Sequence, residues 1–322
     1  MNPINDFTND AWFWSENGLD QYPHIFWRIN DEQNLPQQSL EQLRERLSWD
    51  QAKRIILFHC EGHDAQHNLD FDERIHMIQP IRFDHPRHYF FPWWYGWVMQ
   101  VERSVQYHRS LEPESTKTPK YMFDALLGTP YPRKRWVADQ IERDPESFLW
   151  NIGVPWVDDK AKFLPGTDLH KDPAGAKPVY NDQGEWCNHG TLLPWRIYND
   201  SWFSIILETH SQGYPMVTEK SAKCLLGRRL FINFGNPGVL KLIRDMGYRT
   251  FGSVIDESYD DIQDQSLRFQ AAWKQVEYLL SQDPRRVIEK ILPVLEHNQQ
   301  HFLAQDHDGD FERLVNRIAH AT

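Results

Sequence analysis

YPMVTEKSAKCLLGRRLFINFGNPGVLKLIRDMGYRTFGSVIDESYD, residues 214 to 260, is the stretch whose pattern decides the fold. The polar triplet Thr-Glu-Lys precedes residues with helical spacing, and the apolar run LFINFG at 230–235 then predicts a strand. A second helix is predicted over 237–247, where Gly247 occupies the position of a helix C-cap glycine. Helices that alternate with strands in this way predict parallel βα units.

The rest of the chain extends this alternation. Further strands are predicted at 54–59, 79–83, 121–128, 147–153 and 201–210, and a short one from residue 248. Further helices are predicted at 95–111, 134–143, 218–229, 264–282 and 284–297. Asp283 and Pro284 suit the start of the last of these helices, as N-cap residue and first helical residue. The helix before it has an apolar face made of Phe269, Trp273, Val276 and Leu280.

Residues 155 to 190 are rich in Pro, Gly, Asp and Asn, which indicates an irregular connector and a domain boundary. We therefore expect an α/β fold with an N-terminal α/β domain at 1–165 and a second α/β domain at 166–280. Helices at 281–322 would form a C-terminal tail. In such folds ligands bind at the carboxyl ends of parallel strands, close to helix N-termini.

The composition is that of a globular protein, with 40% hydrophobic and 25% charged residues. No apolar stretch approaches the roughly 18 residues of a membrane span. The three cysteines are far apart and odd in number, which argues against disulfides and for a cytoplasmic location. The net charge of −11 makes a general nucleic-acid binder less expected.

The triplet Thr218, Glu219 and Lys220 combines the groups that a nucleotide requires. Free N–H groups and the dipole at a helix start favour a phosphate, and Lys220 would add a positive charge. Glu219 accepts hydrogen bonds only, so it could hold the hydroxyl groups of a ribose. The alternative is a helix that is simply well capped, with a solvated lysine.

The block from IYNDSWFSIILETHS through VTEKSAKCLLGRRLFINFGNPGVLKLIRDMGYRTFGSVIDESYD resembles a group of bacterial and phage glycosyltransferases. Upstream, YMFDALLGTPYPRKRWVADQI is similar to that group's strand, Pro-rich turn and basic helix start. The resemblance covers roughly residues 120 to 270, and the Thr-Glu-Lys element is similar to the donor site of fucosyltransferases. It implies two Rossmann-like domains of the GT-B architecture, a nucleotide-sugar donor and no required metal or other cofactor.

The resemblance also implies roles for individual residues. Glu219 would bind the donor ribose and Lys220 the diphosphate, while Glu208 and Asn236 would lie at strand ends beside them. The remaining donor-site candidates are Thr218, Arg133, Lys134 and Arg135. The sequence departs from the group's pattern in two places: the basic run stands where a histidine is expected, and SAKCLLGRR replaces a more apolar helix. The donor's identity therefore stays open.

Transfer to an acceptor hydroxyl with inversion requires a general base, which should be a carboxylate or a histidine. Glu61, His63 and Asp64 directly follow the strand predicted at 54–59 and are the catalytic candidates; Asp124 is a further option.

Three patterns in the sequence resemble metal sites, but each is better explained as a loop. His59, His63 and His67 have helical spacing, but Gly62 and the preceding strand favour a loop. Asp70 and Asp72 form an Asp-x-Asp pair that lies outside a clear strand end. Residues 306–312 lack the glycine position of an EF-hand loop.

The expected partners are a nucleotide-sugar donor and a sugar or glycan acceptor. Two alternatives remain open, which are a glycosyltransferase acting on modified bases of phage DNA and a non-catalytic protein that binds nucleotides or sugars. The sequence leaves the donor sugar, the acceptor, the stereochemistry and the oligomeric state undetermined.

Overall fold

In a computed structural model of the chain, the described residues are 25–29, 55–59, 73–98 except 83, 93 and 97, 118–152 except 128–130, and 193–320 except 209–212. They belong to two compact units. Unit 1 combines residues 1–96 with 306–322, and unit 2 contains residues 97–305.

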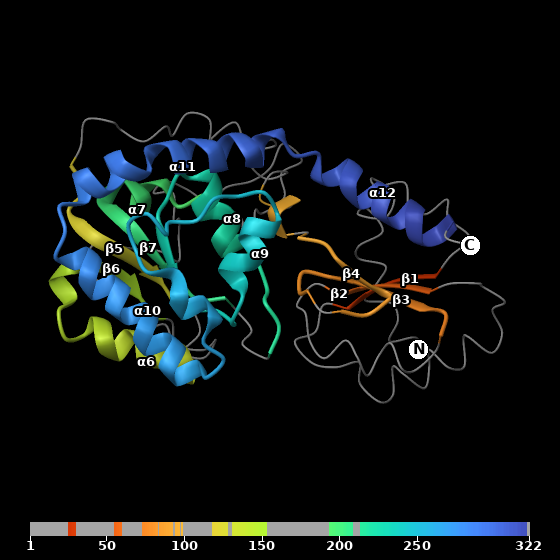
Figure 1. The fold of residues 1–322 in the computed structure, drawn as a ribbon, viewed down its shortest axis with the longest axis horizontal. Coiled ribbons are helices and arrows are strands. Elements are labelled where there is room, and N and C mark those ends of the chain that lie inside the picture. The colour runs from red at the N-terminus through yellow and green to blue at the C-terminus, as the bar shows by residue number, and fades with distance from the viewer. Residues whose placement is uncertain are drawn as a thin grey trace, which may run out of the picture. The chain divides into compact units, whose positions relative to one another are not determined.

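Unit 1 contains a parallel four-stranded sheet in the order β1-β2-β3-β4 (Figure 1). Its helix α12, His307–His320, buries one face that includes Phe311. The ring of Phe311 lies 5.0 Å from that of Phe91, which follows β4 directly. The C-terminal helix is therefore part of this unit's core. The strands are β1 Ile25–Ile29, β2 Ile55–His59, β3 Ile75–Gln79 and β4 His88–Phe90.

Unit 2 contains a second parallel four-stranded sheet, in the order β6-β5-β7-β8. The chain passes from β5 to β6 on one side and later returns to place β7 on the other side. The strand order therefore reverses between β5 and β7, and ligands of open parallel sheets bind at the carboxyl ends of strands at such a point. The strands are β5 Tyr121–Leu126, β6 Phe148–Asn151, β7 Ser201–Ile206 and β8 Phe231–Asn233.

Helices cover both faces of the second sheet (Figure 1). On one face α6, Pro132–Ile141, and α10, Gln265–Leu280, meet the sheet through aromatic rings such as Trp136, Phe148 and Trp273. The other face carries α7 Trp195–Asp200, α8 Glu219–Leu226 and α11 Pro284–Ala304. Between α8 and α10 the chain forms α9 Val239–Asp245 and the 3-10 helix η4 Glu257–Asp261.

Helix α11 is bound into unit 2 by polar side chains as well as by its apolar face. Gln299 donates to the carbonyl of Leu226 at the end of α8 over 2.8 Å. Asn298 accepts from the N–H of Arg249 and donates to its carbonyl over 2.8 and 2.9 Å. These bonds satisfy backbone groups that a helix end and a loop would otherwise leave open.

Most strands and helices predicted between residues 121 and 304 are confirmed to within a few residues, including the Asp283 N-cap and the left-handed Gly247 at the end of α9. The strand predicted at 79–83 is wrong, because β3 ends at Gln79, before Pro80, which has no N–H to donate. The strand predicted from residue 248 is also wrong. There Asn298 and Glu257 bind the backbone in place of a neighbouring strand.

Sheet pairing places the division of the chain earlier than the boundary expected at residue 165. Strands β5 and β6 lie in one sheet with β7 and β8, because β5 pairs with both β6 and β7. The expected tail at 281–322 is divided in the same way: α11 belongs to unit 2 and α12 to unit 1. Strands β1 and β4 and helix α12 were not predicted, and most of the helix predicted at 95–111 lies outside the described residues.

Candidate functional site

The carboxyl ends of β7 and β8 and the start of α8 meet at one edge of the second sheet. Glu208 follows β7 by two residues, and Asn236 follows β8 by three. Thr218 is the N-cap of α8, and its hydroxyl oxygen accepts from the N–H of Lys220. The same hydroxyl donates to the Glu208 carboxylate, so one side chain connects the strand end to the helix start.

The charges at this edge are strongly coupled. Burial raises the pKa of Glu208, and the positive charge of Lys220 offsets part of that rise. Burial acts in the same direction on Glu219, but Lys220 and Lys223 bring the pKa of that carboxyl below its ordinary value. Burial lowers the pKa of the Arg133 guanidinium at the start of α6, and the negative charge of Glu208 offsets part of that decrease. Two carboxyl groups with opposite pKa shifts therefore lie beside three cations.

Several buried polar atoms at this edge have no hydrogen-bond partner within the described part of the chain. They are Glu208 Oε1, Asn233 Oδ1 and Nδ2, Asn236 Oδ1 and Arg133 Nη1. Buried polar atoms in proteins are bonded in the great majority of cases, and each exception needs an explanation. A group of them at the carboxyl edge of a parallel sheet indicates a place where a polar ligand binds.

No protein-family model matches this sequence, and no curated protein matches it significantly.

The loop after β8 is held in place from two sides. Arg268 of α10, itself buried, donates from Nε to the carbonyl of Gly235 over 2.9 Å. The Asn236 amide donates to the carbonyl of Tyr214. This loop therefore presents its unpartnered atoms from a fixed backbone, as a preorganised site requires.

The start of α9 is occupied by a side chain of the same unit. The carboxylate of Asp260 accepts from the N–H groups of Leu240 and Lys241, each over 3.0 Å. A ligand phosphate therefore finds these donors already used. Asp260 is not among the residues expected at the site, although it ends the acidic segment DESYD, which closes the block that carries the resemblance.

Replacing Asp260 by Ala should lower the free energy of unfolding by about 1–2 kcal/mol, because two N–H groups at the start of α9 lose their acceptor. Denaturant unfolding followed by circular dichroism measures this loss. The adjacent and exposed Asp261 supplies the control, since Asp261→Ala should change stability by less than about 0.5 kcal/mol. Equal losses in the two variants would contradict the capping role.

The structure brings six of the predicted donor-site residues to this edge: Glu208, Thr218, Glu219, Lys220, Asn236 and Arg133. Arg135 is instead exposed and paired with Asp139 and Glu142 along its own helix, so it does not join them. Lys134 is buried, with its ammonium group 5.4 Å from the centre of the Tyr131 ring.

The catalytic candidates Glu61, His63 and Asp64 lie outside the described residues, as do His67, Asp70 and Asp72. Among the described residues, no group of three or more His, Cys, Asp or Glu side chains is placed to hold a metal ion. The described helices include none with the length and hydropathy to span a bilayer.

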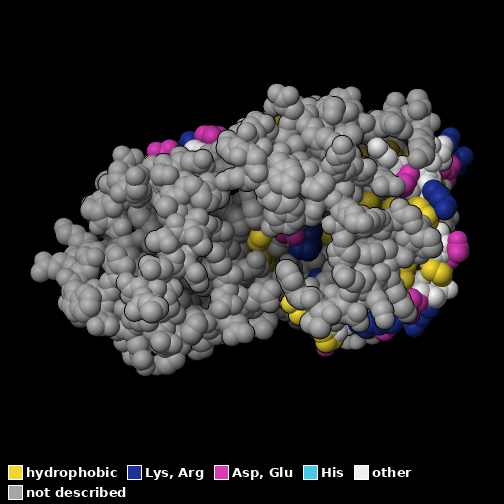
Figure 2. All heavy atoms as spheres, turned by 180° about the vertical axis from the view of Figure 1, so that it is seen from behind, with side chains coloured by type: hydrophobic (Ala, Val, Ile, Leu, Met, Phe, Trp, Pro, Cys, Tyr) yellow, Lys and Arg dark blue, Asp and Glu magenta, His cyan; other side chains and the backbone are white. Residues whose placement is uncertain are grey.

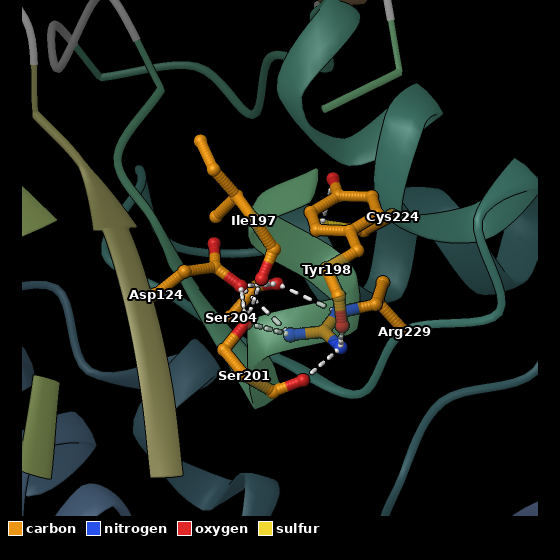
Figure 3. A network of polar contacts seen from close by, with 7 residues as sticks. All are labelled: Asp124, Ile197, Tyr198, Ser201, Ser204, Cys224 and Arg229. Carbon is orange, nitrogen blue, oxygen red and sulfur yellow. Dashed lines mark hydrogen bonds and ion pairs between the residues drawn. The ribbon is translucent and has the colours of Figure 1, made fainter. Parts of the chain in front are cut away.

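Asp124, the further option for a general base, is committed to a buried ion pair (Figure 3). Its Oδ2 accepts from Arg229 Nη2 over 2.7 Å and from the hydroxyls of Ser201 and Ser204. It lies in the middle of β5 and is 3% exposed. Asp124 therefore has a structural role in this network, and its geometry does not support the expectation that it acts as a general base.

Arg229 uses all five of its N–H donors in this network (Figure 3). Two of them bind the carbonyls of Tyr198 and Ser201 at the end of α7, over 3.0 and 2.7 Å. The thiol of Cys224 borders the network, and burial raises its pKa to about 12. The network is thus a structural joint between β5, β7 and α7.

Proposed function

We propose that this protein is a glycosyltransferase that binds a nucleotide-activated sugar at the edge formed by β7, β8 and α8. The observation that carries the proposal is the meeting of cationic side chains and unpartnered buried polar atoms at the strand ends. A nucleotide sugar needs both, since its diphosphate is an anion and its sugars carry hydroxyl groups. The resemblance to bacterial and phage glycosyltransferases supports the same reading.

Lys220 and Arg133 have the charge to hold the diphosphate and to stabilise it as the leaving group. The α8 dipole adds to that field, because Lys220 lies in its first turn. In this proposal no metal is required. The strand order of the second sheet reverses between β5 and β7, which supports a Rossmann-like donor domain. We propose that the N-terminal part forms the second domain of a GT-B architecture and supplies the general base from Glu61, His63 or Asp64.

We propose a sugar or glycan as the acceptor. On the face drawn in Figure 2, the described residues carry Lys and Arg side chains beside Asp and Glu side chains. A surface that binds DNA would concentrate basic side chains instead. The described residues on that face thus give no support to a DNA acceptor.

Lys220→Ala should weaken the binding of the preferred nucleoside diphosphate by roughly tenfold to 150-fold, since a charge-assisted contact contributes about 1.5–3 kcal/mol. A thermal-shift panel of UDP, GDP, CMP, dTDP and ADP first identifies that nucleotide, and calorimetry then compares the affinities.

Lys241→Ala serves as the matched control, because Lys241 is exposed and pairs with Asp245 along α9. It should leave the affinity unchanged. Failure of every nucleotide to bind would reject the proposed function. Equal affinities for the wild type and Lys220→Ala would reject the role of Lys220.

A further inference from the structure

We propose that Glu208 and Asn233 form a binding site for a vicinal diol of the donor, an inference that rests on the proposed nucleotide-sugar function. Asn233 is the last residue of β8, is 3% exposed, and has neither amide atom bonded within the described part of the chain. Glu208 is fully buried, with Oε2 engaged by Thr218 and Oε1 unpartnered.

The two side chains lie on the same face of the second sheet. Asn233 is the register partner of Ile206, and Glu208 follows Ile206 by two residues. Side chains two residues apart on an extended strand point the same way. Both also border Gly235: a Cβ atom there would lie 2.5 Å from Asn233 Oδ1 and 3.4 Å from Glu208 Cγ.

The open positions match a pair of hydroxyl groups. Glu208 Oε1 and Asn233 Oδ1 are acceptors, and Asn233 Nδ2 is a donor. Each hydroxyl of a diol donates one hydrogen bond and also accepts, so two of them can use all three atoms. A phosphate offers acceptors only, and it would meet the Glu208 carboxylate with like charge. The chemistry therefore favours a sugar ring over an anion at this position.

Glu219 is less well placed than Glu208 to bind a diol. Its Oε1 is 2.7 Å from the ammonium group of Lys220 and its side chain is partly exposed. The Glu208 carboxylate is instead fixed by the Thr218 hydroxyl, so the direction of Oε1 is set before a ligand arrives. A carboxylate that is held in place before the ligand binds contributes more to ligand selectivity than one that must first leave another partner. The ribose and the transferred sugar both contain a vicinal diol, and the experiment separates them.

An unpartnered buried amide lowers the stability of the free protein. Replacing such a group by an apolar side chain of similar shape is neutral or stabilising. Asn233→Leu should therefore keep or raise the melting temperature while removing the diol contacts. An asparagine with a structural role would give the opposite result, a lower melting temperature.

The test compares wild type, Asn233→Leu and Glu208→Gln by calorimetry. Each protein is titrated with the preferred ribonucleoside diphosphate, its 2′-deoxy analogue, the corresponding nucleotide sugar, and an analogue of that nucleotide sugar that lacks one hydroxyl of the transferred sugar's diol. The wild type should prefer one diol-bearing ligand over its diol-free counterpart by about tenfold or more, because unpaired buried groups penalise the analogue. Both variants should reduce that preference to within about twofold and leave the affinity for the diol-free ligand within about threefold.

The ligand pair whose preference is lost identifies the diol. Loss between ribo- and deoxyribonucleotide assigns the ribose, and loss between the nucleotide sugar and its deoxy-sugar analogue assigns the transferred sugar. Preferences unchanged in both variants would overturn the proposal and leave ordered water as the occupant. A lower melting temperature of Asn233→Leu, with equal losses for all ligands, would overturn it as well.

Glu257→Gln is the matched control, because Glu257 is a partly buried carboxylate of the same unit that binds Thr250 and Phe251. It should lower stability and leave ligand preference unchanged. The wild-type titration keeps the two proposals apart. If no nucleotide binds the wild type, the proposed function fails and the diol site falls with it. If nucleotides bind and the variants keep their preference, only the diol site fails.

Discussion

Asp124→Ala should lower the free energy of unfolding by about 3–5 kcal/mol, because it leaves the charge of Arg229 buried without its partner. Arg229 is 7% exposed and cannot turn to water without losing the carbonyls of Tyr198 and Ser201. The Ser204 hydroxyl would also lose its acceptor, whereas the Ser201 hydroxyl keeps the carbonyl of Ile197. Denaturant unfolding, followed by circular dichroism and tryptophan fluorescence, measures the change.

The control is Asp245→Ala, which removes the acid of an exposed pair with Lys241 and should cost less than about 1 kcal/mol. Replacing Asp124 by Leu together with Arg229 by Met should cost less than the two single changes added, since neither charge is then left alone. A loss below about 1 kcal/mol for Asp124→Ala would show that the charge of Arg229 is compensated in another way.

The sequence predicts the second sheet well because local signals agree there. Apolar runs, Thr218 and Asp283 as N-caps and Gly247 after α9 fix the elements independently of long-range contacts. It fails where backbone groups bind distant side chains. Nothing local to residues 248–251 shows that Asn298, in another helix, takes the place of a neighbouring strand. The apolar face of α10 is predicted with an error of one residue at its end, where Leu279 is buried and Leu280 is only partly buried.

The candidate site could be predicted only in part. Glu208 and Lys220 stand out in the sequence as polar residues at a strand end and a helix start. Asn233 lies inside an apolar run, and only the register of β7 with β8 brings it to the same face as Glu208. Arg133 and Arg135 are alike in the sequence, yet two residues along a helix turn the side chain by about 200°. The direction of each depends on which face of α6 meets the sheet.

Trp273→Ala should lower the free energy of unfolding by about 3–5 kcal/mol, as for other buried large aromatic residues. The indole ring packs at 6.0 to 6.3 Å, between ring centres, from Phe148, Phe234 and Trp136. Its removal leaves a cavity between α10 and the sheet that these rings cannot close. Thermal and denaturant unfolding measure the loss, and Trp273→Phe should recover most of it.

Tyr278→Ala is the control on the same helix, because Tyr278 is 47% exposed, and it should change stability by less than about 0.5 kcal/mol.

Trp273 also supports the site from the opposite face of the sheet. It contacts Phe234, which lies between Asn233 and Gly235, and successive side chains of an extended strand point to opposite faces. Packing of Phe234 therefore orients the unpartnered amide of Asn233. Trp273→Ala should accordingly weaken nucleotide-sugar binding even at temperatures where the variant is folded, and unchanged binding would show that Arg268 and the Asn236–Tyr214 bond hold the loop after β8 without Trp273.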